Sequence, residues 1–343
     1  MEISRRELLI HSLQGQYLLK KGPKREVVSR LCGLQAQFAQ NPRYALQIRA
    51  EDYTDKGWSD GLLKVWAHRN TLHLIRQEEL GLYLSAKEGP PRPWEDTWWG
   101  IPKEVKPYWS AFICREIAAG NDQREGIKEA CRRDGMEEEL LEKIFHGWGG
   151  LIKEMSDRGM IAYCPGTEKR FLLPPKPDFL PMEQARLEVM ARYFAVFGPA
   201  TVEDCSDFTG FKLGETRRLF KKLELPLKEL TCEGTTYYYL KEPEEDRLPA
   251  CLLLSGFDQM IMGYHDRSRI FDPADKRKVI TCSGIVFPTI LLQGRIRARW
   301  KRVPGGLEVT PFCSLSLRSK NLIETAARRV FGKDTRVSFL PEI

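Results

Sequence analysis

The sequence predicts an α+β protein in which tandem winged-helix (helix-turn-helix) domains precede a small antiparallel β-rich domain. Two observations lead to this prediction. Apolar residues at helical spacing are twice followed by a pair of short strands, which is the plan of a winged helix. From residue 248 onward the chain is rich in short strand-like runs, and the run at 295–300 alternates apolar and basic residues, which is typical of antiparallel strands.

The composition is that of a globular protein. The chain has 343 residues, enough for more than one domain at roughly 100–200 residues each. Apolar residues make up 42% and charged residues 29%, which excludes a mainly disordered chain. No apolar run approaches the ~20 residues needed to cross a bilayer, and the N-terminus lacks a signal-peptide core. We therefore expect a cytoplasmic protein with no membrane partner. The net charge of +7 permits a polyanionic partner without requiring one.

Proline- and glycine-rich stretches divide the chain near residues 90–103, 174–181 and 241–249. Proline prevents a helix from continuing and stiffens the joint between two elements. The breaks predict four domains: a first winged helix at 1–95, a second at 103–176, a third at 182–241 and a β-rich domain at 248–343.

The first predicted domain carries a cluster of amide side chains. Apolar spacing predicts one helix over 8–16 and a second over 27–38. Gln35 and Gln37 then fall near the end of the second helix, just before Pro42. This cluster is either a polar site or simply the frayed end of a helix with its polar residues turned outward.

A single strand is predicted over 65–75. Arg69, Thr71 and His73 then alternate along one face and offer donors suited to phosphate or to a polar cleft. A purely structural role in the strand explains the same residues. His68 and His73 would lie on opposite faces, so no metal site is expected. The nine cysteines include no CxxC pair and predict reduced, mostly buried thiols.

The second predicted domain has the elements of a winged helix. Helices are expected over 111–119, 124–133 and 137–158. Strands at 160–164 and 170–173 follow, separated by a glycine-containing turn, which is the signature of a hairpin.

The third predicted domain repeats this plan more clearly. A helix over 184–197 is followed by Thr201, an N-cap with acidic residues in the next turn. A basic amphipathic helix over 212–223 and two wing strands at 227–230 and 235–240 complete it. Such a helix can enter a DNA groove or lie along phosphates, although a solvated helix face explains its charges equally well. Its basic residues include Lys212, Arg217 and Arg218.

The β-rich domain is expected to contain strands at 279–282, 289–292 and 295–300. The last of them places every second residue on one basic face, made of Arg295, Arg297, Arg299 and Lys301. Four like charges in a row repel one another unless something anionic covers them. A phosphate backbone is one such cover, and acidic side chains such as Glu342 are the alternative.

The order of several short motifs resembles the AlkZ/YcaQ family of winged-helix DNA glycosylases, and in particular its AlkZ-like branch. No P-loop, GxGxxG, HExxH or GxSxG motif points to another enzyme class. Residues 33–37 (GLQAQ) resemble the family's catalytic Gln-apolar-Gln motif, and residues 66–75 resemble its Arg-x-Thr-x-His stretch. The other similar stretches are 197–201 with 207–208, 257–259 with 263–268, and 294–295 with 300–301.

The resemblance implies a monofunctional DNA glycosylase without cofactor or metal. It would hydrolyse the N-glycosidic bond of cationic N7-alkylated purines in duplex DNA, and some family members also unhook interstrand crosslinks. Gln35 and Gln37 would be the catalytic residues. A cationic base is already a good leaving group, so amide oxygens that place a water and stabilise positive charge on the sugar are sufficient. An amide cannot act as a strong general base near neutral pH.

The resemblance also assigns residues around this motif, and a monomer is expected. Together with the basic surfaces above, the expected DNA-binding residues are Arg69, His73, Lys212, Arg217, Arg218, His265, Arg267, Arg295, Arg297 and Arg299. Asp258 and Thr71 are expected to orient the site from behind, with a buried hydrogen-bonding role as the alternative for Asp258.

Two other classes of function remain open at this point. One is a non-catalytic winged-helix DNA-binding protein, such as a transcription regulator, and the other is a protein-interaction scaffold. The presence of both Gln35 and Gln37 in the expected context favours the enzyme. A regulator would more naturally carry a dimerisation helix or an effector domain.

Overall fold

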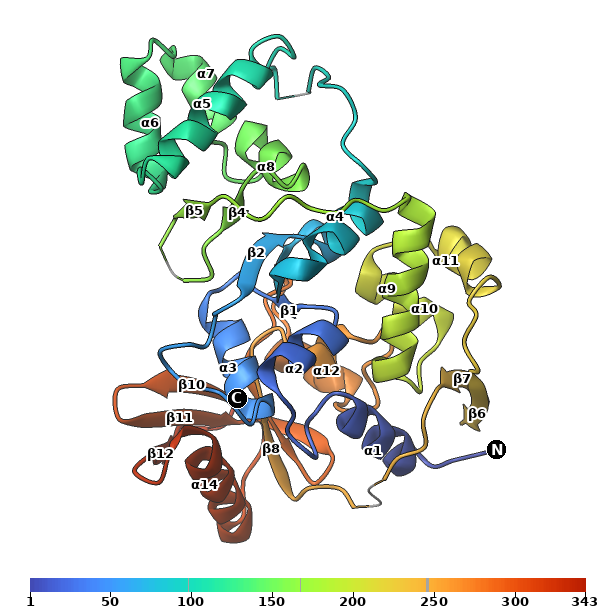
Figure 1. Ribbon diagram of the computed structural model, residues 1–343. Coiled ribbons are helices and arrows are strands. Elements are labelled where there is room, and N and C mark those ends of the chain that lie inside the picture. The colour runs from blue at the N-terminus through green and yellow to red at the C-terminus, as the bar shows by residue number, and fades with distance from the viewer. Residues whose placement is uncertain (98, 167, 245–246) are drawn as a thin grey trace. The chain divides into compact units, whose positions relative to one another are not determined.

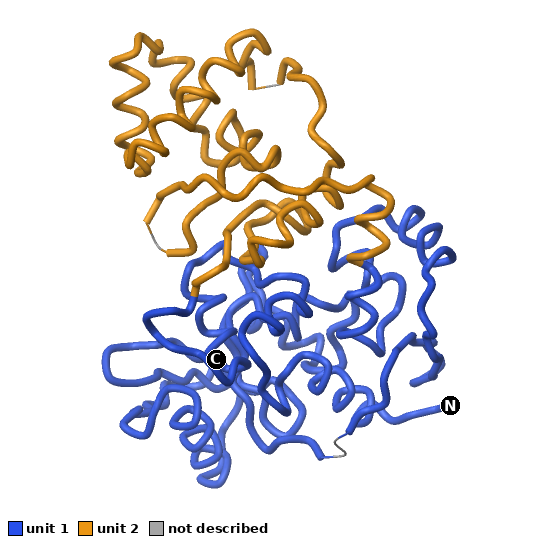
Figure 2. The backbone as a smooth tube through the Cα atoms, in the orientation of Figure 1, with its two compact units in different colours: residues 1–58, 190–343 blue, residues 59–189 orange. Residues whose placement is uncertain are grey.

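The computed structural model describes residues 1–97, 99–166, 168–244 and 247–343 and contains both helices and antiparallel sheets (Figure 1). The chain forms two compact units (Figure 2). Unit 1 consists of residues 1–58 and 190–343, and unit 2 of residues 59–189. The division into four domains stays a prediction, and its third break includes residues 245–246, which lie outside the described residues. Within the described ranges, no helix is long and apolar enough to span a membrane.

The first 58 residues of unit 1 form three helices and a two-residue strand: α1 (Arg5–Gly15), α2 (Lys24–Arg30), β1 (Leu34–Gln35) and α3 (Gln40–Arg49). The predicted helix over 27–38 is wrong beyond Arg30. Cys32 and Gly33 adopt left-handed backbone conformations, with φ of +55° and +85°, which a right-handed helix cannot contain. The amide cluster therefore begins on extended chain and not at the end of a helix.

The predicted elements of the third domain are present: α9 (Met182–Phe197), α10 (Val202–Thr209), α11 (Leu213–Phe220), β6 (Lys228–Cys232) and β7 (Thr235–Tyr239). The N-cap at Thr201 is confirmed, because its side chain and that of Asp204 each accept the other's backbone N–H. Gly210 ends α10 in a left-handed conformation. The β6–β7 hairpin packs against the chain's N-terminal residues in a small apolar cluster of Ile3, Leu8, Leu230, Cys232, Tyr237 and Tyr239.

The remainder of unit 1 contains a sheet with the strand order β12-β11-β10-β9-β8, in which only β11 and β12 are parallel. Its elements are β8 (Cys251–Leu254), α12 (Gln259–Met262), α13 (Lys276–Val279), β9 (Thr289–Leu292), β10 (Arg295–Val303), β11 (Gly306–Pro311), α14 (Leu317–Phe331) and β12 (Arg336–Phe339). The strand predicted at 279–282 is wrong, because α13 occupies 276–279 and only one bridge, Ile280 to Val286, follows. Helix α14 was not predicted.

Helix α3 packs against this sheet and α14 through three aromatic rings. Tyr44 of α3, Trp300 of β10 and Phe331 of α14 meet edge to face, with ring centroids 5.2 to 5.9 Å apart. Such pairs contribute about 0.5–1.5 kcal/mol each beyond the area they bury. Helix α3 begins directly after the amide cluster, so these contacts also fix the chain that leaves it.

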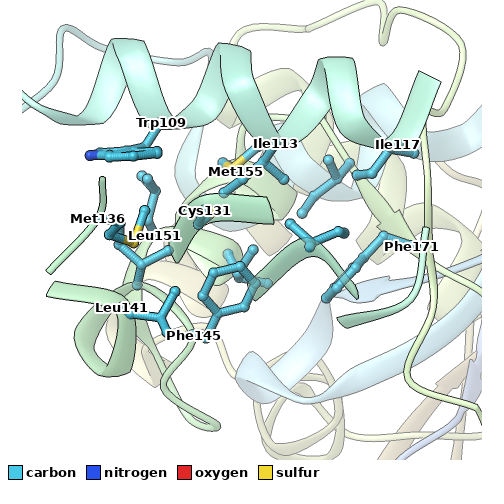
Figure 3. Packing of buried hydrophobic residues seen from close by; sticks show 14 of the residues in the cluster. Trp109, Ile113, Ile117, Cys131, Met136, Leu141, Phe145, Leu151, Met155 and Phe171 are labelled. Atoms are coloured by element: carbon cyan, nitrogen blue, oxygen red, sulfur yellow. The ribbon is translucent and has the colours of Figure 1, made fainter. Parts of the chain in front are cut away.

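Unit 2 combines four antiparallel strands with a helical layer: β2 (Leu62–Trp66), β3 (Leu72–Arg76), α4 (Leu80–Glu88), α5 (Lys106–Ala118), α6 (Arg124–Arg133), α7 (Glu138–Ile144), α8 (Gly150–Asp157), β4 (Ala162–Tyr163) and β5 (Phe171–Leu172). Its core lies between α5 and the other helices, and Figure 3 shows Trp109, Ile113 and Ile117 of α5 within it. The turn between β4 and β5 contains residue 167, which is outside the described part of the chain.

Two predictions for unit 2 need correction. The helix predicted over 137–158 is split into α7 and α8, because Gly150 has a φ of +71° and approaches the carbonyl of Lys143 too closely for any side chain. The strand predicted over 65–75 is a hairpin, since Arg69 and Asn70 both have a φ of +53° and turn the chain back. Arg69, Thr71 and His73 therefore do not line one strand face.

Candidate active site

The two candidate catalytic glutamines lie on a short segment of unit 1, residues 33–41. Gln35 ends β1 and is 6% exposed, whereas Gln37 is half-buried. The Oε1 atom of Gln37 is buried and has no hydrogen-bond partner among the described residues, so its capacity to accept hydrogen bonds is unused. The segment contains no carboxylate.

A buried ion pair stands behind this segment. The guanidinium of Arg49, at the end of α3, donates two hydrogen bonds to the carboxylate of Asp258, at 2.5 and 3.0 Å. Both side chains are fully buried. Asp258 also accepts hydrogen bonds from Ser255 and from the backbone N–H of Met260. Burial alone raises the pKa of Asp258, but Arg49 and the hydrogen bonds outweigh it and hold that pKa below its usual value. The carboxylate of Asp258 is therefore ionised, and its oxygens are occupied by these hydrogen bonds. It is not a general base.

The predicted residues His265 and Arg267 lie just after α12 and have protein partners. The ring Nδ1 of His265 lies 2.7 Å from the Asp207 carboxylate, and this hydrogen bond raises the pKa of the exposed imidazole. The Nε of Arg267 donates to the carbonyl of Ile261, and burial lowers the pKa of the guanidinium. Their contact with DNA stays a prediction.

The basic face predicted on β10 is present. Arg297 and Lys301 are exposed, while Ile296, Ala298 and Trp300 alternate with them and are buried. Within the described residues, no salt bridge covers the basic face, and Glu342 does not pair with it. The other two cations have weaker partners: Arg295 donates to a backbone carbonyl, and Arg299 lies over the ring of Phe287 at 4.4 Å.

The basic surface of α11 is partly neutralised. Arg217 forms a 2.7 Å ion pair with Glu203 of α10, and Arg218 lies 3.9 Å from Glu215. Lys212 occupies the N-cap position of α11 and is exposed. A phosphate would have to compete with these carboxylates, so α11 is a weaker anion surface than β10.

Arg69, Thr71 and His73 belong to unit 2. The hydroxyl of Thr71 donates to the carbonyl of His68 and thereby closes the β2–β3 turn. His73 is fully buried, with Nδ1 2.9 Å from the carbonyl of Thr71. Its ring packs edge to face on that of His68, at 5.3 Å, which corrects the expectation that the two lie on opposite faces.

The burial of His73 predicts a pH-dependent stability. Burial lowers the pKa of His73 well below its ordinary value, so the unfolded chain takes up this proton first as the pH falls. The folded state therefore loses up to about 1.4 kcal/mol per pH unit below the pKa of the unfolded histidine, near 6.5. We expect the His73→Asn variant, which keeps a donor near Nδ1, to lack this component. Urea unfolding of both proteins at pH 7.5, 6 and 5 measures it, and parallel losses in the two would contradict the expectation.

A pocket in unit 1 of about 570 Å³ was not predicted from the sequence. Its lining includes Phe38, Tyr44, Phe257, Trp300 and Arg299. Phe38 directly follows Gln37 and is 47% exposed. The signal that could have found the pocket is the presence of an aromatic residue beside each polar motif, Phe38 beside Gln37 and Phe257 beside Asp258.

Comparison with known proteins decides the family. Residues 28–331 match the family described as DNA glycosylase AlkZ-like. The chain belongs to this family. It is 28% identical to the interstrand DNA cross-link repair glycosylase of Streptomyces sahachiroi, with 99% of each chain covered.

The fold agrees with this assignment. The structure is similar to that of Streptomyces sahachiroi DNA glycosylase AlkZ, with a TM-score of 0.79 and 24% identity, over 99% of this chain and 100% of the other. As an AlkZ-like DNA glycosylase, the protein is a hydrolase of N-glycosyl bonds.

Proposed function

We propose that this AlkZ-like DNA glycosylase removes cationic N7-alkylated purines from duplex DNA. The observation that carries the proposal is the pair of amides, Gln35 and Gln37, on a segment that contains no carboxylate. A neutral purine needs protonation before it leaves, whereas an N7-alkylated purine already carries the positive charge. A catalytic segment without an acid or a strong base therefore suits the cationic lesion.

In this proposal the two amides position the attacking water and stabilise the positive charge on the sugar. The Oε1 of Gln37, which has no partner among the described residues, accepts a hydrogen bond from the attacking water and orients it toward the sugar carbon. The bond from that carbon to the base breaks with its electron pair leaving on the base, which becomes neutral. The water oxygen then bonds to the sugar carbon, and its proton passes to solvent. The carbonyl dipoles of both amides stabilise the positive charge that develops on the sugar as the bond to the base breaks. Such fixed dipoles are most effective in a site that excludes bulk water, which fits the burial of Gln35.

We further propose that tandem winged-helix domains hold the duplex, with the enzyme acting as a cytoplasmic monomer. The basic face of β10 and the succession α9, α10, α11 and β6–β7 support this proposal. Removal of one strand's purine by the same reaction would also unhook an interstrand crosslink made through N7. The name of the Streptomyces relative, an interstrand DNA cross-link repair glycosylase, supports that extension.

A comparison of lesions tests the proposed specificity. Duplexes of one sequence would carry N7-methylguanine, as the cationic lesion, or 1,N6-ethenoadenine, as a neutral one. We expect base release from the first at a rate at least 100-fold above that from the second. Equal rates would mean that the enzyme protonates its leaving group, and the amide mechanism would be wrong.

The basic face of β10 gives a second test. Replacement of the exposed Arg297 or Lys301 by alanine is expected to weaken binding to all duplex sequences alike. It should also lower the slope of log K against log salt by about 1 for each phosphate that the variant no longer neutralises. Fluorescence anisotropy over a range of salt concentrations measures this slope. Arg328→Ala is a matched control, because that exposed arginine of α14 pairs with Glu324. An unchanged slope in Arg297→Ala and Lys301→Ala would remove β10 from the DNA interface.

A further inference from the structure

We propose that Gln259 is a positioning residue that fixes the catalytic segment 33–41, an inference that rests on the proposed function of Gln35 and Gln37. Gln259 opens α12 and is 2% exposed. Its Nε2 donates a hydrogen bond to the carbonyl of Gly33, 226 residues earlier in the chain. This carbonyl lies two residues before Gln35, at the point where the chain leaves its left-handed turn.

The residues that precede Gln259 contact the same segment at two further points. The ring of Phe257 stacks on that of Phe38, with centroids 5.8 Å apart and planes at 26°. Gly256 lies against Asn41 so closely that a β-carbon there would be 2.6 Å from Oδ1 of Asn41. Turn 255–259 therefore contacts the catalytic segment at three points. These are Gly33 at its start, Phe38 just after Gln37, and Asn41 at its end.

Buried contacts hold the turn itself in place. Asp258 caps α12 through the N–H of Met260 and is locked by the buried guanidinium of Arg49. Phe257 has a φ of +51°, a conformation that the surrounding hydrogen bonds must hold. The link from turn 255–259 to the first turn of the segment is the side chain of Gln259.

The contact requires the chemistry of a glutamine. A donor on a long, neutral side chain is needed to reach the carbonyl of Gly33 without burying a charge. The Oε1 atom of Gln259 is buried and has no partner among the described residues, so the glutamine carries an energetic cost that methionine would avoid. Its Nε2 contact with the catalytic segment is the gain that offsets this cost.

The expected effect is on the chemical step and not on DNA binding. A displacement of about 1 Å in a catalytic group can lower a rate by as much as 100-fold. Gln259→Met keeps the volume of the side chain and removes the donor. We expect its single-turnover rate of N7-methylguanine release at saturating enzyme to fall about 10-fold to 100-fold, with the enzyme concentration at half-maximal rate unchanged.

The pH dependence of the rate of Gln259→Glu distinguishes a hydrogen-bonding role from a simple packing role, which would not depend on pH. An ionised carboxylate cannot donate and repels the carbonyl of Gly33, whereas a protonated carboxyl can donate to it. Burial raises the pKa of such a carboxyl. We expect the rate of Gln259→Glu, relative to wild type at the same pH, to be lowest at pH 8.5 and to recover as the pH falls to 5.5.

Gln16→Met is the matched control. Gln16 is also a fully buried glutamine of unit 1, donates through Nε2 to the hydroxyl of Tyr264, and has an Oε1 without a partner among the described residues. Within the described part of the chain, its side chain makes no hydrogen bond to segment 33–41. We expect Gln16→Met to be about as destabilised as Gln259→Met in urea unfolding and to release the base at the wild-type rate.

Hydrogen exchange of the backbone amides of residues 33–38 gives a result that does not depend on activity. Faster exchange in Gln259→Met than in Gln16→Met supports the proposal. If the wild type is active and Gln259→Met has the same rate of base release and the same exchange as the wild type, the positioning role is overturned. The proposed function is then unaffected. An inactive wild type overturns the proposed function, and the positioning role with it.

Discussion

Gln37→Ala is expected to lower the single-turnover rate of base release by about 100-fold to 1,000-fold, the loss seen when one preorganised dipole is removed from a transition state. Affinity for undamaged duplex should stay within about twofold of wild type, because alanine removes no charge. In the proposed mechanism Gln37 supplies an acceptor to the attacking water, so its loss affects the transition state more than the bound substrate.

Matched variants separate this role from general damage to the segment. Gln37→Glu keeps an oxygen acceptor of the same reach and is expected to retain more activity than Gln37→Ala. Gln77→Ala removes an exposed amide outside segment 33–41 and should leave the rate unchanged. Gln35→Ala should be as slow as Gln37→Ala, and the double variant little slower than either, since groups that act as one unit do not add. A Gln37→Ala rate equal to wild type would remove Gln37 from the chemistry.

Arg49→Met is expected to destabilise the protein by about 3–5 kcal/mol, the second large effect. The substitution leaves the carboxylate of Asp258 buried without its counter-charge. Urea unfolding at pH 7 measures the loss. Because folding lowers the pKa of Asp258, the contribution of this pair is present above the pKa of the unfolded carboxyl and is lost as the pH falls through the folded value.

A double variant tests the reason for that loss. Arg49→Met combined with Asp258→Leu removes both charges and should recover part of the stability that the single variant loses, since it avoids the unpaired charge. The recovery is incomplete because the N–H groups of Ser255 and Met260 lose their acceptor. Its base release should still be slow, because Asp258 also caps the turn that carries Gln259. A double variant no more stable than Arg49→Met would show that packing, and not charge, explains the effect.

Local sequence patterns predicted much of the secondary structure. The alternation along 295–300 correctly placed the cations on one face of a strand, because a strand has a fixed period of two. The cap at Thr201 was equally readable, since the capping residues are adjacent in sequence. Both patterns depend only on neighbours within a few residues.

The failures have a common physical cause. Helical periodicity continued through Cys32 and Gly33. The apolar pattern contains no sign that Cys32, which is not a glycine, adopts a φ of +55°. The turn at Arg69 and Asn70 interrupted an apolar run in the same way, although Asn is a residue that tolerates this conformation. Tertiary contacts determine the backbone conformation at such positions, and the periodicity of the sequence carries no information about those contacts.

The candidate site was only half predictable. The resemblance predicts Gln35 and Gln37 as the catalytic pair, but the two contacts that organise their surroundings join residues more than 200 positions apart. Arg49 pairs with Asp258, and Gln259 reaches Gly33. A buried arginine is not distinguishable from a surface arginine in one sequence, because its charge favours exposure.

Release of free N7-methylguanine from a duplex that contains it is the most direct test of the proposed glycosylase activity. The purified protein in molar excess over lesions, without added metal, would be incubated with the duplex, and the free base and abasic sites would be counted together. The proposal predicts one abasic site for each base released, no strand break, and a rate far above spontaneous depurination. A rate no higher than that of the protein-free duplex would contradict it.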